Sequence, residues 1–388
     1  MSKKISVGID IGSATIKIIV AEWVKEKQHP VIIGIGQTET QGMKSGYIYD
    51  IEKVTVSVKK AVRQAEKSSK IKIKKAFVSI GGINLSSVAN NGYSITSKAD
   101  EEVTKLDTTK AIQESREKLD KTNKKIIHSI PINYKLDGKE IHGRIEGMKG
   151  SKLEVKTLFI TCSKQNIEDL INIMAELNIN IVDILASPVA LSLSLLSEKQ
   201  KMAGCVLLDI GSESVSLAVF EDNLLQSLRV FNIGSNDITK DIALLFKINL
   251  DEAENLKTGR LIGDYSRNEM DEIIEARLID IFELVENHLK RMKRNELLPA
   301  GVILSGGGAS VKKIEDIAKK QLKIPARVGP GDSSFDKKYK IKNNSWYTVM
   351  GLILSSDNNP NNELNSSITD NLKQAKGIFK SFLSQLLP

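Results

Sequence analysis

The stretches "VGIDIGSATIKIIVAE" (residues 7–22) and "VLLDIGSESVSLAVF" (residues 206–220) repeat one pattern about two hundred residues apart. In each stretch an apolar run reaches an aspartate, a glycine follows two positions later, and a second apolar run begins after a short polar turn. The alternating and β-branched residues predict two strands joined by a tight turn. Because the unit occurs twice, the chain is predicted to contain two related halves.

The flanking sequence extends this repeat. After the first copy, residues 31–36 predict a third strand, and apolar residues at spacings of three and four predict a helix over 51–68. After the second copy comes another strand, then helices over 236–247 and 251–258 and a long helix over 269–294. Three strands followed by helices in each half indicate an α/β fold. At 388 residues the chain also exceeds the roughly 250–300 residues of a single core, so two lobes are expected.

Composition excludes several classes of protein. The net charge is +8, but cationic and acidic residues are mixed along most of the chain and aromatic residues make up only 5%, so we expect no nucleic-acid partner. Two cysteines are too few for a disulfide framework, and the four histidines show no metal-ligand spacing. No signal segment and no apolar run of about 20 residues is present, which predicts a cytoplasmic location.

Changes in amino-acid composition along the chain predict the domain boundaries. Residues 83–157 are polar and lysine-rich and are expected to form a small subdomain inserted in the first lobe. The predicted segments are the first lobe at 1–82 and 158–203, the insertion at 83–157, the second-lobe core at 204–235 and 295–355, a distal second-lobe subdomain at 236–294, a flexible linker at 356–370 and a terminal helix at 371–388.

The two turns have the chemistry of phosphate-binding loops. Glycine permits a sharp turn and lets backbone N–H groups approach an anion. Mg²⁺ bound beside a phosphate keeps its waters and takes one or two carboxylates, so Asp10 and Asp209 are its candidate ligands, mainly through water. Lys17 can neutralise phosphate charge. The predicted phosphate-binding residues of the two turns are Gly12, Ser13, Ala14, Thr15, Lys17, Gly211 and Ser212.

A third turn, "LSGGGAS" (residues 304–310), lies between a predicted strand and a predicted helix, and its Gly306, Gly307 and Gly308 are expected to line a nucleoside. Each of the three turns alone is common in proteins. In this order they resemble the phosphate and adenosine loops of the actin, Hsp70 and sugar-kinase superfamily. The resemblance implies a two-lobed ATPase fold that binds ATP and Mg²⁺.

Residues 37–82 narrow the resemblance. "GQTETQGMKSGYIYDIEK" and the sequence that follows are similar to the bacterial FtsA family of cell-division proteins, and the similarity covers nearly the whole chain. It identifies residues 83–157 with the small subdomain inserted in that family. It also implies that "NIGSNDITKDIALLFKINLDEAENLKTG" brings Gly234, Glu254 and Lys257 to the nucleotide, although the last two could instead form a surface ion pair.

The second turn departs from the family, since Glu213 stands where small residues are usual. Its carboxylate could orient water or coordinate metal, or it could point outward. Asp10, Asp209 and Glu213 are therefore the candidate catalytic residues, and the sequence predicts ATP binding with at most weak hydrolysis.

The amino-acid composition changes twice toward the end of the chain. Residues 356–370 are rich in Asn and Ser and predict a linker. The terminal segment then places an apolar stripe beside lysines, which predicts an amphipathic helix that binds an anionic membrane surface; docking on protein is the alternative. The stripe and its lysines are Ile378, Phe379, Phe382, Leu383, Leu386, Leu387, Lys376 and Lys380.

The family resemblance implies a protein that polymerises head to tail, tethers FtsZ filaments to the inner face of the cytoplasmic membrane at the division site, and recruits later division proteins through the inserted subdomain. It implies that the FtsZ C-terminal peptide binds the distal subdomain, where Arg277, Arg291 and Arg294 could meet acidic residues. A PilM-like cytoplasmic module for pilus assembly is the alternative. A chaperone would need a substrate domain and a sugar kinase a catalytic carboxylate, and neither is evident.

Overall fold

A computed structural model describes residues 4–24, 29–120, 122–260, 265–329 and 344–356. The terminal helix predicted over 371–388, with its apolar stripe and lysines, lies outside these residues. Within the described ranges, no helix combines the length and the apolar character needed to cross a membrane.

The first lobe is built on a five-stranded sheet in the order β11-β6-β1-β2-β3. The chain opens as an antiparallel meander of β1, β2 and β3, and β6 and β11 then join β1 in parallel. The strands are β1 (Lys4–Ile11), β2 (Thr15–Trp23), β3 (Val31–Glu39), β6 (Lys75–Ile80) and β11 (Asn180–Ala186). A small hairpin of β4 (Met43–Lys44) and β5 (Tyr47–Ile48) follows β3.

The second lobe repeats this sheet, in the order β14-β13-β12-β15-β16. Again three strands form an antiparallel meander and two later strands join the first of them in parallel. They are β12 (Cys205–Ile210), β13 (Val215–Glu221), β14 (Leu224–Phe231), β15 (Val302–Ser305) and β16 (Ala326–Val328). The predicted two-lobed α/β fold with a repeated core is confirmed.

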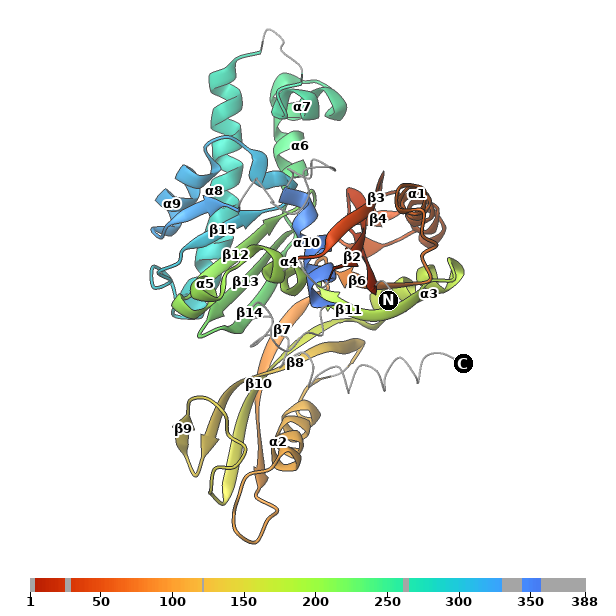
Figure 1. The fold of residues 1–388 in the computed structure, drawn as a ribbon. Helices are drawn as coiled ribbons and strands as arrows, with labels where there is room; N and C mark the ends of the chain where they lie inside the picture. Colours follow the sequence, from red (N-terminus) through yellow and green to blue (C-terminus); the bar gives the residue numbers. More distant parts are fainter. Residues whose placement is uncertain (1–3, 25–28, 121, 261–264, 330–343, 357–388) are drawn as a thin grey trace.

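Helices cover the sheets, and their ends follow local sequence signals. In the first lobe, α1 (Ile51–Ser69) begins at Asp50, whose carboxylate accepts a hydrogen bond from Lys53 N at 3.1 Å, as expected of a helix cap. The other helices of this lobe are α3 (Lys164–Glu176) and α4 (Ser187–Leu195), whereas α5 (Glu198–Ala203) packs on β13 of the second lobe (Figure 1). The second lobe carries α6 (Ser235–Phe246), α7 (Leu250–Lys257), α8 (Arg267–Arg291) and α9 (Ile314–Leu322).

A separate sheet, in the order β7-β10-β8-β9, forms the inserted subdomain with α2 (Lys105–Glu117). Its strands are β7 (Ser86–Ile95), β8 (Lys124–Leu136), β9 (Lys139–Ile141) and β10 (Lys152–Ser163). Figure 1 shows this subdomain at the opposite end of the molecule from α7 and the free end of α8. The long strands β8 and β10 run from the insertion back to the body of the protein.

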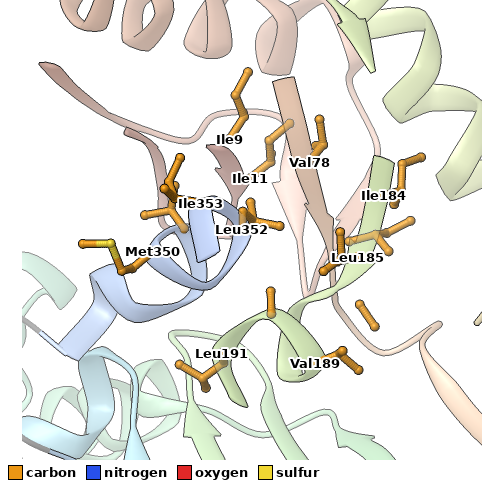
Figure 2. Packing of buried hydrophobic residues seen from close by; sticks show 14 of the residues in the cluster. Ile9, Ile11, Val78, Ile184, Leu185, Val189, Leu191, Met350, Leu352 and Ile353 are labelled. Atoms are coloured by element: carbon orange, nitrogen blue, oxygen red, sulfur yellow. The ribbon is translucent and has the colours of Figure 1, made fainter. Parts of the chain in front are cut away.

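Two helices, α4 and α10 (Tyr347–Ser355), cross each other between the lobes. The second of them, α10, packs on α4 so closely that a Cβ added at Gly351 would stand 1.7 Å from Ala190 O. Leu352 and Ile353 of α10, with Leu191 of α4, enter the apolar core that Figure 2 shows beside Ile9 of β1. Glycine is therefore required where these helices cross, since any side chain would separate them.

The two cysteines are free and fully buried, Cys162 near the end of β10 and Cys205 at the start of β12. Burial raises the pKa of the Cys162 thiol to about 11 and that of Cys205 to about 12. Both thiols are therefore protonated at neutral pH.

Candidate functional site

The two repeated turns have the same geometry. Gly12 N donates to Thr15 O at 3.1 Å in the turn between β1 and β2, and Gly211 N donates to Ser214 O at 2.9 Å in the turn between β12 and β13. Each turn comes directly after the strand that carries its aspartate. Asp10 pairs across the strands with Lys17, whereas the position opposite Asp209 is a serine, so the structure contains one lysine where the repeat could have had two.

The side chains of Asp10, Lys17 and Asp209 form a buried charged cluster between the lobes. Lys17 is only 6% exposed, and its Nζ donates to Thr15 Oγ1 at 2.6 Å. Ser79 Oγ, from β6, donates to Asp10 Oδ1 at 2.5 Å. The cluster combines two carboxylates and one ammonium, because Lys17 interacts electrostatically with both aspartates.

Burial dominates the titration of this cluster. It raises the pKa of Asp209 to about 6, with Asp10 adding to the rise and Lys17 opposing it. Burial likewise raises the pKa of Asp10, against the opposing effects of Lys17 and Ser79, and lowers the pKa of Lys17, against the two aspartates. These charged groups are costly to bury and suit a site whose ligand brings compensating charge.

A cleft of about 830 Å³ opens over the cluster, within the size range of small-molecule and cofactor sites. Residues of both lobes line it, including nearly every predicted nucleotide-binding residue. The predicted residues that line it are Asp10, Gly12, Ser13, Ala14, Thr15, Lys17, Asp209, Gly211, Ser212, Glu254, Lys257, Gly306, Gly307 and Gly308. Neither Glu213 nor Gly234 is among its described lining residues.

The third turn closes against the second. Gly306 has φ +88°, and a Cβ there would lie 2.5 Å from Asp209 Oδ1 and 2.4 Å from Ile210 O. Any other residue would therefore push on the aspartate. A Cβ at Gly307 would meet no heavy atom within 4 Å, so this part of the turn presents bare backbone to the cleft. Such a surface lets a flat ligand approach the main chain.

Glu254 and Lys257 form an ion pair in the wall of the cleft. Lys257 Nζ lies 2.6 Å from Glu254 Oε2, and Thr239 Oγ1 of α6 contacts both side chains. Lys257 is nearly buried, with 6% of its side chain exposed, whereas Glu254 is 44% exposed. The predicted ion pair is therefore present and lines the cleft, while its contact with a nucleoside stays a prediction.

At the N-terminus of α6 the sequence predicted only Gly234 as part of the site, whereas the structure places Ser235 and Asn236 in the cleft lining. Ser235 N donates to Gly211 O at 2.9 Å, and Asn236 N donates to Ser212 O at 2.8 Å, which fixes the helix against the second turn. Gly234 allows this approach, because a Cβ there would lie 2.5 Å from Ser212 O. The sequence also missed the cleft-lining cations Arg267, Lys312 and Lys313. Lys312 and Lys313 follow the third turn almost directly in the sequence, and this proximity could have indicated that they belong to the site.

Among the described residues, no group of three or more His, Cys, Asp or Glu side chains is placed to hold a metal ion. A metal beside Asp10 and Asp209 would thus have few protein ligands and would rely on water and ligand oxygens. That donor set fits Mg²⁺, which keeps several waters and takes one or two carboxylates.

Glu213 has a different position from the one considered in the sequence. Its Oε2 accepts a hydrogen bond from Ser45 N in the loop between β4 and β5, at 2.5 Å. Ser45 Oγ donates to Asn232 Oδ1 at 2.8 Å, and Gly46 N donates to Ser13 Oγ at 2.8 Å. The loop thus contacts both repeated turns, and Glu213 bridges the lobes; a role for it in water activation gains no support from this position.

The three predicted peptide-binding arginines do not form one patch. Arg277 pairs with Asp241 through two hydrogen bonds, at 2.7 and 3.0 Å, which ties α8 to α6. Arg294 pairs with Glu221 at the end of β13, at 2.8 Å. Arg291 is exposed, but it lies about 21 Å along α8 from Arg277 at the usual helical rise. Arg277 and Arg294 thus already have carboxylate partners and Arg294 lies beyond the end of α8, while peptide binding by these arginines stays a prediction.

Two family models match the chain. The model for cell division protein FtsA matches residues 206–351, and the model for the SHS2 domain inserted in FTSA matches residues 82–161. The chain is 30% identical to the cell division protein FtsA of Bacillus subtilis (strain 168) over 349 residues, 84% of this chain and 79% of the relative. It is 26% identical to that of Pseudomonas aeruginosa over 375 residues, 91% and 89% of the two chains.

Solved structures show the same fold at low sequence identity. A chain of the PilM-PilN type IV pilus biogenesis complex superposes with a TM-score of 0.64 at 16% identity, covering 90% of this chain and 97% of that one. MreB 5 of Spiroplasma citri, bound to AMPPNP, superposes with a TM-score of 0.53 at 13% identity, covering 97% and 100%.

Proposed function

The chain belongs to the FtsA family of cell division proteins and has an actin-like fold, and from this premise we propose that it binds ATP with Mg²⁺ and links FtsZ filaments to the cytoplasmic membrane. The observation that carries the nucleotide part is the convergence of three turns, distant in sequence, on one cleft of about 830 Å³. Two of these turns have the same geometry, so each lobe offers the ligand an equivalent turn.

Each group in the cleft has a part in holding a nucleoside triphosphate. The amides of the turns after β1 and β12 are suited to phosphate oxygens. The Lys17 ammonium offsets phosphate charge, and the aspartates hold a hydrated Mg²⁺, which would shield the phosphate charge. The bare backbone at Gly307 suits the flat nucleoside, and Glu254 and Lys257 lie where they can meet its polar atoms. The fold neighbour MreB 5 carries AMPPNP in its crystal structure, which agrees with this assignment.

Hydrolysis is proposed to be weak. Phosphoryl transfer to water needs a group that orients the water, and the one unusual carboxylate of the second turn, Glu213, is engaged by Ser45 N. Nucleotide would then act mainly on the angle between the lobes, and so on head-to-tail contacts between copies of the chain. Contacts of that kind produce open filaments when the rotation between copies does not close.

The proposed partners contact different parts of the chain. The FtsZ C-terminal peptide is proposed to bind the distal subdomain over 236–294. There Arg291 is exposed and could pair with an acidic residue of the peptide, whereas Arg277 is already paired with Asp241. Later division proteins are proposed to bind the inserted subdomain. The terminal segment, with its stripe from Ile378 to Leu387, is proposed to lie in the membrane surface as a peripheral helix.

Sedimentation with phosphatidylglycerol-containing vesicles, with and without Mg-ATP, tests this function by comparing the full chain with a chain that ends at Lys376. Pelleting of the full chain alone is the expected result. If both chains stay in the supernatant, or both pellet equally, attachment through the terminal helix is wrong. A PilM-like module would then be the better account, in line with the fold similarity to the PilM-PilN complex.

A further inference from the structure

The positive charge of the chain is concentrated in one short segment. Residues 59–75 contain eight cationic side chains and a single carboxylate, Glu66, so they contribute +7 of the net +8. The cations are Lys59, Lys60, Arg63, Lys67, Lys70, Lys72, Lys74 and Lys75, and all eight are exposed. We call this set the basic face.

The basic face lies on the outside of the first lobe. The apolar residues of α1, such as Val58 and Ala61, are buried against β2 and β3, which leaves the cationic residues on the opposite side of the helix. Figure 1 shows α1 on the side of the first lobe turned away from the second lobe. The carboxylate of Glu66 pairs with Lys72 at 3.0 Å, so it compensates only one of the eight cations.

The lysine-rich end of this face is far from the nucleotide cleft. The parallel strands β1 and β6 begin at Lys4 and Lys75, so these lysines lie at the edge of the sheet where the strands begin. Asp10 and its turn lie where β1 ends. The last turn of α1 runs toward the edge where Lys4 and Lys75 lie: a Cβ at Gly36, past the middle of β3, would meet Ala61 O, whereas a Cβ at Gly34, nearer the start of β3, would meet Ser69 in the last turn. These lysines therefore cannot contact phosphates in the cleft.

The described chain also ends at this edge. Trp23, at the end of β2, is paired in register with Lys4 and donates through Nε1 to Ser356 Oγ at 3.1 Å. Ser356 is the last described residue, and the sequence that follows it contains the apolar stripe and lysines of the terminal segment. The lysine-rich end of the basic face and Ser356, after α10, thus lie at the same edge of one sheet.

From this arrangement, and resting on the membrane attachment proposed above, we infer that the basic face docks on an anionic lipid surface. Stable peripheral attachment generally takes two signals, and a polybasic patch beside an apolar segment is such a pair. Each lysine near an anionic bilayer strengthens binding by up to about fivefold.

Lipid fits this face better than nucleic acid does. Seven of the eight cations are lysines, which act as point charges, and residues 59–75 contain no aromatic side chain on which a base could stack. The face is an exposed surface formed by the outer side of α1, the segment that follows it and the start of β6, and a bilayer can meet such a surface directly.

The test neutralises four lysines of the basic face and leaves the Glu66–Lys72 ion pair intact, as Lys67→Gln, Lys70→Gln, Lys74→Gln and Lys75→Gln in the full chain. Binding to phosphatidylcholine vesicles with and without phosphatidylglycerol is measured by sedimentation at low and high salt. The expected result is at least about tenfold weaker binding to phosphatidylglycerol vesicles at low salt, with the difference lost at high salt. If this variant does not fold, Lys59→Gln, Lys60→Gln and Arg63→Gln test the same face.

A matched control removes the same charge from exposed lysines of the inserted subdomain, as Lys105→Gln, Lys110→Gln, Lys139→Gln and Lys149→Gln. The control is expected to bind like the unaltered chain. Equal loss in both variants, or no loss in the first, would overturn the inference. So would a labelled DNA duplex that the basic face binds more tightly than it binds vesicles.

The chain ending at Lys376 separates this inference from the proposed function. If that chain fails to bind while the basic-face variant binds fully, the terminal helix suffices and the basic face is not a lipid surface. If the truncated chain retains binding that salt and the basic-face substitutions abolish, the basic face binds lipid and the proposed terminal helix is unnecessary. If the unaltered full chain binds no vesicles, both are wrong.

Discussion

Glu213 of the second lobe accepts a hydrogen bond from the backbone N–H of Ser45 in the first lobe, at 2.5 Å. The residues are 168 positions apart, and the contact starts from one of two turns that are otherwise copies of each other. In the first copy the corresponding position is Ala14, which has no carboxylate. The bridge therefore makes the two turns functionally different, since only the second one has a carboxylate that reaches across to the other lobe.

Removing this bridge should loosen the lobes. Glu213→Ala leaves Ser45 N without its charged acceptor, and a hydrogen bond of this kind contributes about 1.5–3 kcal/mol. We expect faster amide exchange at Ser45 and Gly46 and faster release of bound nucleotide. Glu213→Gln, which keeps an acceptor oxygen, should fall between the two. Unchanged exchange at both amides in the alanine variant would show that the bridge does not hold the lobes.

Lys17→Ala and Asp10→Ala should weaken ATP binding. Lys17 is the only lysine of the buried cluster, and a hydrogen bond to a charged group is worth about 1.5–3 kcal/mol, so affinity should fall about 10- to 150-fold. Titration with a fluorescent ATP analogue in the presence of Mg²⁺ measures the change. Lys105→Ala, on the inserted subdomain, is the control and should bind normally; full affinity in the Lys17 variant would remove the site assignment.

Asp209 should make stability depend on pH when nucleotide and metal are absent. Burial raises its pKa from the ordinary aspartate value of 3.8 to about 6, so the folded state holds the proton more tightly than the unfolded chain does. Its contribution to the free energy of unfolding is present in full below about pH 4 and is lost as the pH rises through 6, a change of about 3 kcal/mol.

The comparison that isolates this effect is with Asp209→Asn. The depressed pKa values of His128 and His288, each about 4, act in the opposite direction, but both chains contain these histidines. The asparagine variant should therefore gain stability relative to the unaltered chain between pH 4 and 6, as measured by denaturant unfolding. A difference that stays constant over this range would mean that Asp209 is not titrating there.

Two glycines provide a matched pair for the packing of the lobes. Gly351→Ala places a methyl group 1.7 Å from Ala190 O at the crossing of α4 and α10, so the helices must separate, at a cost of about 1–3 kcal/mol or more. Gly307→Ala adds the same group where no heavy atom lies within 4 Å. Thermal unfolding should show a loss of stability only for the first variant, while nucleotide titration should show an effect of the second. Equal stability of the two would contradict the observed close crossing.

The sequence predicted well where a feature is local. The turns at Gly12 and Gly211 could be predicted because the apolar pattern of the strands and the position of the glycine involve only residues that are close together in the sequence. Their convergence with Gly306 on one cleft followed from the resemblance to a known fold. The Glu213–Ser45 contact could not be predicted, because it depends on how two lobes meet and no short-range pattern encodes that distance.

Two other failures have the same kind of cause. The ion pairs of Arg277 with Asp241 and of Arg294 with Glu221 were not predicted, because they depend on how distant helices and strands pack together. The basic face was overlooked because charge was judged along the chain as a whole. Over residues 59–75 the carboxylates nearly vanish, and the placement of α1 then gathers the cations on one side of the lobe.

The two buried thiols can report when the apolar core around them opens. Cys162 belongs to a strand that returns to the first lobe and Cys205 to the first strand of the second lobe, and neither has exposed surface. A thiol that is protonated and buried reacts with an alkylating reagent only when its surroundings open. Because both thiols belong to one continuous apolar core, equal alkylation rates in the two single-cysteine variants would show that this core opens as a unit. A nucleotide that stabilised only part of this core would slow one of the two rates more than the other.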